Sequence, residues 1–174
     1  MNKERGLFVG RFNPFHLGHL KVVEHVLEQE DELIIAIGST QQSHTATNPF
    51  TAGERVLMIH ETMKEAEIPL DRLFIVTIPD IFRNSVWVSH LRSYCPPFTC
   101  VYTNSSLIKR LFMEAGVEVK TTGIYNRKIL KGANIRKLMI KGDEWHQMVP
   151  KAVLDVIRSI DGLNRLKSIA TETD

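Results

Sequence analysis

The sequence predicts an α/β fold in which a doubly wound parallel sheet carries helices on both faces. Short apolar runs alternate five times with stretches whose apolar residues recur at helical spacing, which is typical of parallel sheets. The run 33–37 is apolar throughout, as expected for a strand that is buried on both faces. The polar motifs follow these runs, at the carboxyl edge where such sheets bind ligands.

Five short apolar runs are predicted to form the strands. Pro79 stops the third of them, because proline cannot donate to a sheet ladder. In chain order the predicted strands are Leu7–Val9, Leu33–Ile37, Leu73–Ile78, Thr99–Thr103 and Val117–Val119.

Helical spacing and capping residues place the helices. Thr51 and Glu54 have the spacing of a capping box, which starts a helix at Thr51. Gly116 occupies the position after a helix where a left-handed residue is needed. The other predicted helices are Leu20–Glu28, one after Asn84, Ser105–Ala115, Asn134–Ile140, one opened by Pro150 and ended by Gly162, and Asn164–Ala170.

The length and composition favour a single domain. A chain of 174 residues predicts one domain over residues 1–170, with residues 171–174 frayed. No apolar run is long enough to span a membrane, and no signal peptide precedes the first strand, so we expect a cytoplasmic protein.

The net charge and the cysteine spacing argue against a nucleic-acid-binding protein and against a zinc site. A net charge of +2 without a block of like charges gives no reason to expect nucleic acid as a partner. Cys95 and Cys100 have no second cysteine pair beside them, so we interpret them as core residues rather than a zinc site.

The stretch G-R-F-N-P-F-H-L-G-H, residues 10–19, is the most informative motif. It lies where the first predicted strand turns into the first predicted helix, and a helix N-terminus binds anions through its unpaired N–H groups and its dipole. His16 and His19 are expected on one face of the first helical turn. Gly18 removes a side chain where a phosphate and the backbone come close.

This motif resembles the H-x-G-H signature of the nucleotidylyltransferase superfamily. The resemblance implies a Rossmann-like doubly wound parallel sheet with C-terminal helices, and transfer of a nucleotide to a phosphate-bearing acceptor. Three later stretches narrow the resemblance to the archaeal-type nicotinamide-nucleotide adenylyltransferases: residues 38–55, residues 80–88 and Gly132-x-x-Ile135-Arg136.

Members of that family transfer AMP from ATP to nicotinamide mononucleotide and form NAD and pyrophosphate. The resemblance implies Mg²⁺ that is held mainly by the ATP phosphates, no protein metal ligands, and a homo-oligomer, commonly a hexamer. Its implied catalytic residues are His16, His19, Arg136 and Arg11. Its implied ATP-binding residues are Gly10, Arg11, Phe12, His16, Gly18, His19, Tyr125, Arg127 and Arg136.

The acceptor anion needs no general base, so positioning and charge stabilisation suffice. His16 is assigned to the junction of α-phosphate and acceptor, and His19 to the ATP phosphates. Arg136 can fork onto the β- or γ-phosphate, and Arg11 holds a phosphate across the junction.

The implied acceptor-binding residues follow the second and third predicted strands: Gly38, Ser39, Asp80, Asn84 and Trp87. Trp87 offers a flat π face to the cationic nicotinamide ring, and Asp80 and Asn84 can hydrogen-bond its ribose or carboxamide. Trp87 as an ordinary core aromatic and Asp80 as a strand-end cap are the alternatives.

Two departures from the family pattern concern the phosphates. Hydroxyl residues usually precede the signature arginine, whereas this chain has Lys131-Gly132-Ala133-Asn134 there. An arginine is usual in the loop after Ser43-His44, and Thr45-Ala46-Thr47 replaces it. Both changes predict weaker ATP binding. The alternative acceptors are nicotinic acid mononucleotide, flavin mononucleotide and phosphopantetheine, and a more remote alternative is a non-catalytic nucleotide sensor.

Overall fold

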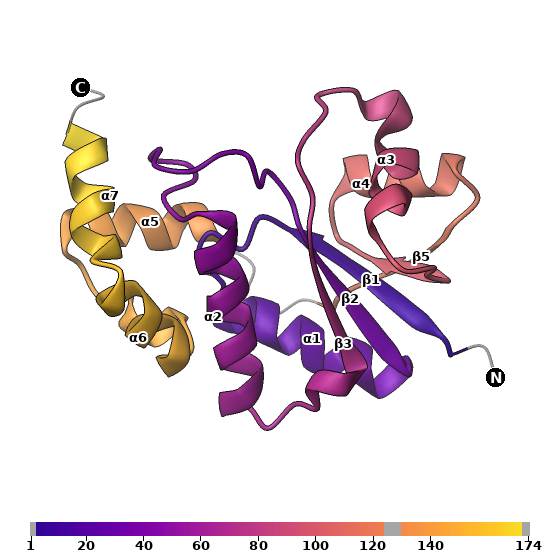
Figure 1. Cartoon of the computed structure of the whole chain (residues 1–174), viewed down its shortest axis with the longest axis horizontal. Coiled ribbons are helices and arrows are strands. Elements are labelled where there is room, and N and C mark those ends of the chain that lie inside the picture. The colour runs from indigo at the N-terminus through magenta and orange to yellow at the C-terminus, as the bar shows by residue number, and fades with distance from the viewer. Residues whose placement is uncertain (1–2, 124–129, 172–174) are drawn as a thin grey trace.

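The computed structural model describes residues 3–123 and 130–171. Its centre is a parallel sheet with the strand order β3-β2-β1-β4-β5 (Figure 1). The strands confirm the predicted runs with small changes at their ends. They are β1 Arg5–Gly10, β2 Glu32–Ile37, β3 Leu73–Thr77, β4 Cys100–Tyr102 and β5 Glu118–Lys120.

The described residues also form seven α-helices and three short 3₁₀ turns. The helices are α1 Leu17–Gln29, α2 Ala52–Glu65, α3 Trp87–Tyr94, α4 Ser106–Glu114, α5 Gly132–Lys141, α6 Lys151–Ser159 and α7 Gly162–Thr171. The 3₁₀ turns are η1 Leu70–Arg72, η2 Asn84–Val86 and η3 His146–Met148.

Side chains of the sheet alternate between two core clusters, one on each face. Leu33 and Ile35 of β2 join the larger cluster, to which α1, α2, α5, α6 and α7 contribute. Ile34 of the same strand joins the smaller cluster, which α3 and α4 cover. Every residue of β2 is buried, so the prediction of a strand buried on both faces is confirmed. Figure 1 shows the C-terminal helices on the α2 side of the molecule.

Local signals explain most helix ends. Thr51 Oγ1 accepts the backbone N–H of Glu54 at 3.2 Å, and the Glu54 carboxylate accepts the N–H of Thr51 at 2.9 Å, which confirms the capping box. Gly116 has a φ of +69° and ends α4 as predicted. Ser105 caps the start of α4 through the N–H of Ile108.

The prediction that Gly162 ends the helix opened by Pro150 is wrong. That helix, α6, ends at Ser159, and Gly162 is the first residue of α7. Asp161 makes the left-handed turn between them, with a φ of +53°. A Cβ at Gly162 would lie 2.8 Å from the Phe50 ring, so close packing explains this glycine.

Both cysteines are free thiols. Cys100 is buried on β4, and Cys95 is half-buried at the end of α3. Burial raises the pKa of the Cys100 thiol to about 12 and that of Cys95 to about 11. Both thiols are therefore protonated near neutral pH, as expected for packing residues. Within the described residues, no helix combines the length and the apolar composition that a membrane span requires.

The sheet has a switch point beside β1. The chain winds outward from β1 through β2 to β3 and then returns to place β4 on the other side of β1. In open parallel sheets the loops on the two sides of such a point diverge and leave a crevice at the carboxyl ends of the strands. The motif that follows β1 therefore lies at the centre of this crevice.

Candidate active site

Two histidines cap the start of α1 reciprocally. His16 is the N-cap residue, and its Nδ1 accepts the backbone N–H of His19 at 3.3 Å. The Nδ1 of His19 accepts the backbone N–H of His16 at 3.2 Å. The two rings stack with their centroids 3.5 Å apart and their planes within 17° of parallel.

Both imidazoles are neutral near pH 7. Burial lowers the pKa of His16 from 6.5 to about 4. Burial, and next the neighbouring His16, lower the pKa of His19 well below 6.5. Because each Nδ1 accepts a backbone N–H, the one proton of each neutral ring lies on Nε2. The pair therefore presents two N–H donors, beside the positive end of the α1 dipole.

Aromatic rings fix the orientation of His19. Its ring centroid lies 4.8 Å from that of Phe12, 5.3 Å from that of Phe15 and 6.0 Å from that of Phe8. Phe12 and Phe15 are fully buried. This apolar wall explains the loss of solvation that keeps His19 neutral, and it leaves the ring little rotational freedom.

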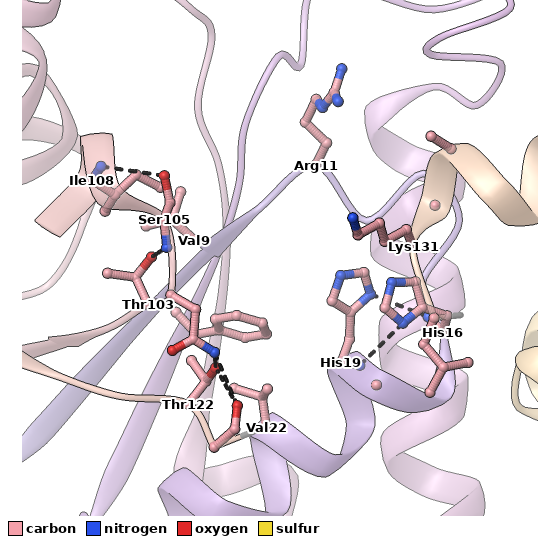
Figure 2. Close-up of a pocket in the computed structure, with 17 residues that line it drawn as sticks. Val9, Arg11, His16, His19, Val22, Thr103, Ser105, Ile108, Thr122 and Lys131 are labelled. Atoms are coloured by element: carbon pink, nitrogen blue, oxygen red, sulfur yellow. Dashed lines mark hydrogen bonds between the residues drawn. The ribbon is translucent and has the colours of Figure 1, made fainter. Parts of the chain in front are cut away.

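A cleft of about 420 Å³ opens in front of the histidines. It lies between the β1–α1 turn and the residues that follow β4 and β5, on one side of the switch point. Arg11 and Lys131 lie on the histidine side of the cleft in Figure 2, opposite the β4 side. The lining residues are Phe8, Val9, Arg11, His16, Gly18, His19, Val22, Thr103, Asn104, Ser105, Ile108, Thr122, Gly123, Leu130, Lys131, Gly132 and Ala133.

The opposite wall of the cleft is a small polar network. Thr103 Oγ1 accepts the N–H of Ser105 at 3.1 Å. The Asn104 amide donates to Thr122 Oγ1 and, at 3.0 Å, to the Gly123 carbonyl (Figure 2). These bonds tie the loop after β4 to the loop after β5. The residue types are common in any loop, so apart from their position after predicted strands no signal in the sequence marks them.

Two glycines of the motif make room for aromatic rings. A Cβ at Gly10 would lie 2.8 Å from the Phe12 ring, and one at Gly18 would lie 3.1 Å from Nδ1 of His16. Gly10 therefore permits the packing of Phe12, and Gly18 permits the His16 cap. Phe12 itself is buried beneath the site and has a φ of +50°.

The two arginines that are predicted to be catalytic occupy different environments. Arg11 is exposed and lines the cleft. Arg136 is buried and does not line it, and its guanidinium donates to the carbonyls of Asn13 at 2.7 Å and Ala46 at 3.0 Å. Burial, and next the charge of Arg11, lower the pKa of Arg136 to about 10, so it stays cationic near neutral pH.

The predicted acceptor-binding residues lie across β1 from the cleft. Gly38 and Ser39 follow β2, and Asp80 and Asn84 follow β3, so these residues belong to the other half of the crevice. Trp87 is half-buried at the start of α3, and its ring meets that of Phe112 edge-on with centroids 5.9 Å apart. The structure thus gives Trp87 a packing contact beside the predicted acceptor half.

The remaining predicted residues are Tyr125 and Arg127, which lie outside the described part of the chain, as do residues 172–174. Among the residues that are described, no group of three or more histidine, cysteine, aspartate or glutamate side chains could hold a metal ion.

Sequence reasoning did not assign a role to Asn13 or to Arg55. Asn13 is buried, its side-chain oxygen accepts the N–H of Phe50 at 3.2 Å, and its carbonyl accepts Arg136. It therefore joins the β1–α1 turn to the loop before α2. Arg55 is fully buried and donates to carbonyls of both loops. The signal available for Arg55 was its place at the end of the stretch 38–55, which carries the resemblance.

The sequence of the chain is similar to those of known proteins. The cytidylyltransferase-like family model matches residues 7–159. The nicotinamide-nucleotide adenylyltransferase of Archaeoglobus fulgidus is 51% identical over 95% of this chain and 97% of its own length. The protein of the same name from Halobacterium salinarum is 48% identical over 98% of this chain and 94% of its own.

Solved structures share the fold at lower identity. A bifunctional NMN adenylyltransferase/ADP ribose pyrophosphatase from Francisella tularensis, complexed with AMP and a manganese ion, superposes with a TM-score of 0.78 at 22% identity. The match covers 96% of this chain, which spans about half (52%) of that protein. Nicotinic acid mononucleotide adenylyltransferase from Plasmodium falciparum has a TM-score of 0.67 at 12% identity, with 94% and 98% of the two chains covered.

Proposed function

The chain belongs to the cytidylyltransferase-like family and, within it, to the nicotinamide-nucleotide adenylyltransferases, and we propose that it transfers AMP from ATP to nicotinamide mononucleotide, forming NAD and pyrophosphate. The observation that carries this proposal in the structure is the His16–His19 pair. Two neutral imidazoles present their Nε2–H donors at a helix N-terminus, in front of a cleft of about 420 Å³. Such a set of donors suits a phosphate chain.

The reaction is an in-line displacement at the α-phosphorus of ATP. An oxygen of the acceptor's 5′-phosphate forms the new P–O bond, and the bond to pyrophosphate breaks. The acceptor oxygen is already anionic near neutral pH, so the protein needs to position both phosphates and stabilise the developing charge. We assign His16 to the α-phosphate at the junction with the acceptor and His19 to the phosphates of ATP.

The cationic residues complete the phosphate site. Arg11 is exposed between the two halves of the crevice and can hold a phosphate across the junction. Lys131 lines the cleft at the N-cap of α5 and has no side-chain capping bond, so its ammonium can reach the triphosphate. Arg136 contributes a positive charge that its hydrogen bonds to the Asn13 and Ala46 carbonyls hold in place. Its guanidinium can bind the β- or γ-phosphate only if these hydrogen bonds rearrange.

We assign ATP to the cleft on the β4 side of β1 and the acceptor to the side of β2 and β3. Gly10 and Phe12 offer backbone groups to ATP, and Tyr125 and Arg127 are assigned to it by resemblance alone. Gly38, Ser39, Asp80, Asn84 and Trp87 surround the acceptor. Nicotinic acid mononucleotide, flavin mononucleotide and phosphopantetheine are the acceptors against which this assignment is tested.

The reaction uses a divalent cation, for which we propose Mg²⁺ bound to the ATP phosphates. The absence of a metal-binding cluster from the described residues fits a metal that arrives with the nucleotide. Bound there, the cation neutralises charge on the triphosphate and its leaving group. A homo-hexameric assembly, a cytoplasmic location and one domain over residues 1–170 stay predictions.

Direct detection of the product tests the proposal. Purified protein with ATP, Mg²⁺ and nicotinamide mononucleotide is expected to form NAD and pyrophosphate in equal amounts, measured by chromatography and by a phosphate assay after pyrophosphatase. Formation of phosphate without NAD would identify the protein as an ATP hydrolase and contradict the proposal.

A further inference from the structure

Arg55, on α2, is a buried cation that lines no part of the cleft. Its side chain is fully buried, and its guanidinium donates four hydrogen bonds, all to backbone carbonyls. Nε donates to Thr51 of the same helix at 3.2 Å. Arg55 makes no ion pair with any residue that the structure describes, so its charge is balanced by carbonyl dipoles.

Three of these carbonyls belong to the two loops that frame the crevice. Nη1 donates to the Arg11 carbonyl at 2.9 Å and to the Gly38 carbonyl at 2.8 Å. Nη2 donates to the Ser39 carbonyl at 3.2 Å. One planar guanidinium thus joins the loop after β1 to the loop after β2. The first loop carries Arg11, and the second lies in the acceptor half.

The backbone at both contacts is in the left-handed region. Phe12, directly after Arg11, has a φ of +50°, and Ser39, directly after Gly38, has a φ of +53°. Non-glycine residues adopt this conformation only where surrounding contacts hold them, and such positions cluster at functional sites. The hydrogen bonds of Arg55 supply that restraint in both loops at once.

The electrostatics fit a structural role for the fork rather than a role in proton transfer. Burial, and next the charge of Arg11, lower the pKa of Arg55, whereas the carboxylate of Asp80 raises it. The guanidinium nevertheless stays protonated near neutral pH. Asp80 belongs to the acceptor half, so Arg55 interacts electrostatically with a charged residue on each side of β1.

We propose that Arg55 is a positioning residue for the acceptor: its fork fixes the loop of Arg11 relative to the loop of Gly38 and Ser39, so that the acceptor's phosphate meets the α-phosphorus in line. This inference rests on the proposed function for its kinetic part. Lysine keeps the positive charge but has no planar guanidinium. Arg55→Lys therefore removes the hydrogen bonds between the two loops, which we call the clamp, without removing the charge.

Arg72 supplies a matched control. Its guanidinium also donates to three backbone carbonyls, those of Leu27, Glu30 and Asp31 at 2.8 Å each. It precedes β3, at the amino edge of the sheet and away from the crevice. Arg55→Lys and Arg72→Lys therefore remove the same kind of contact from opposite edges.

Steady-state kinetics give the first test. Arg55→Lys is expected to lower kcat about tenfold or more, because small misplacements of reacting groups have large effects. It is also expected to raise KM for nicotinamide mononucleotide several-fold, whereas KM for ATP changes less than about threefold. Arg72→Lys is expected to keep all three values near those of the wild type. Equal rises in the two KM values, or unchanged kinetics in Arg55→Lys, would overturn the proposal.

Hydrogen exchange in the absence of substrates gives a second test that needs no activity. The clamp predicts that amides of residues 11–13 and 38–40 exchange slowly in the ligand-free wild type, and faster in Arg55→Lys but not in Arg72→Lys. Rapid exchange of both loops in the ligand-free wild type would refute the clamp even if Arg55→Lys failed to fold. A wild type that forms no NAD but passes this test would refute only the proposed function.

Discussion

At the start of α1, Nδ1 of His16 accepts the backbone N–H of His19, and Nδ1 of His19 accepts the backbone N–H of His16. In an ordinary capping box a serine or threonine and a glutamate play these parts. Here both parts are taken by imidazoles, which keep a second nitrogen for a ligand. The cap therefore holds both Nε2–H donors in place before any substrate arrives.

Replacing His19 separates capping from catalysis. His19→Glu preserves the capping box, because glutamate is the usual partner at this position, but places a negative charge against the phosphates. We expect a fall in kcat of about a thousandfold and a lower thermal stability, because the apolar wall of Phe8, Phe12 and Phe15 desolvates the carboxylate. His19→Ala is expected to lose turnover to a similar extent and stability by about 1 kcal/mol.

His60→Ala is the matched control for these variants, because His60 lies on the outer part of α2 and pairs only with the neighbouring Glu61 in the described contacts. It is expected to retain wild-type turnover. Near-normal turnover in His19→Glu would remove His19 from the mechanism.

The free energy of unfolding is expected to decrease as the pH is lowered, because His16 becomes protonated. Its pKa is depressed from 6.5 to about 4 in the folded protein, so unfolding takes up a proton between these values. The contribution is fully present above pH 6.5 and is lost as pH falls towards 4, by up to about 3 kcal/mol. His16→Asn keeps an N-cap side chain without a titrating group.

Denaturant unfolding at pH 7, 5.5 and 4.5 measures this difference. The wild type should lose more stability than His16→Asn over that range. Parallel losses in the two proteins would show that His16 titrates normally in the fold.

Trp87 has two candidate roles that kinetics can separate. If its ring stacks on the pyridine of the acceptor, Trp87→Ala raises KM for nicotinamide mononucleotide about tenfold with little change for ATP. If it only packs on Phe112, both constants change together. Phe112→Leu is the control, because it removes the edge contact and should lower Tm without raising KM for the acceptor.

Metal removal should stop the reaction without unfolding the protein. A chelator is expected to abolish NAD formation and to leave Tm of the nucleotide-free protein unchanged, because no protein metal cluster exists among the described residues. Added Mg²⁺ should restore activity. A drop in Tm on chelation, measured without nucleotide, would reveal a resident metal.

Lys131→Ser tests how the chain compensates for its missing hydroxyl residues. Lys131 is the N-cap of α5 without a side-chain capping bond, so serine should cap the helix and stabilise the fold by about 0.5–1 kcal/mol. Loss of the ammonium should nevertheless raise KM for ATP several-fold. A lower KM for ATP in this variant would show that Lys131 does not contribute to triphosphate binding.

The fold was largely predictable because apolar runs and helix-capping residues are local features of the sequence. The β2 run, the Thr51 capping box and Gly116 all depend on local sequence, and the structure confirms each. Gly162 was misread because a glycine that permits close packing looks the same in sequence as one that permits a turn. The contact that decides between them, with Phe50, is more than a hundred residues away.

The site was predictable where its residues are adjacent in sequence. The H-x-G-H spacing placed both histidines at one helix start, but the reciprocal cap was not foreseen, because histidine is an unusual capping residue. The contacts of Arg55 and Arg136 with neighbouring loops were not predictable for a different reason. Their partners are backbone carbonyls in distant loops, and carbonyls leave no signal in residue identity.

Pyrophosphate release from ATP and Mg²⁺ is the measurement that decides the proposed reaction, with four acceptors offered separately: nicotinamide mononucleotide, nicotinic acid mononucleotide, flavin mononucleotide and phosphopantetheine. A nicotinamide-nucleotide adenylyltransferase should give strong release with nicotinamide mononucleotide and little with flavin mononucleotide or phosphopantetheine. Release that is strongest with either of these two, or no release with any of the four, would rule out the proposed AMP transfer to nicotinamide mononucleotide.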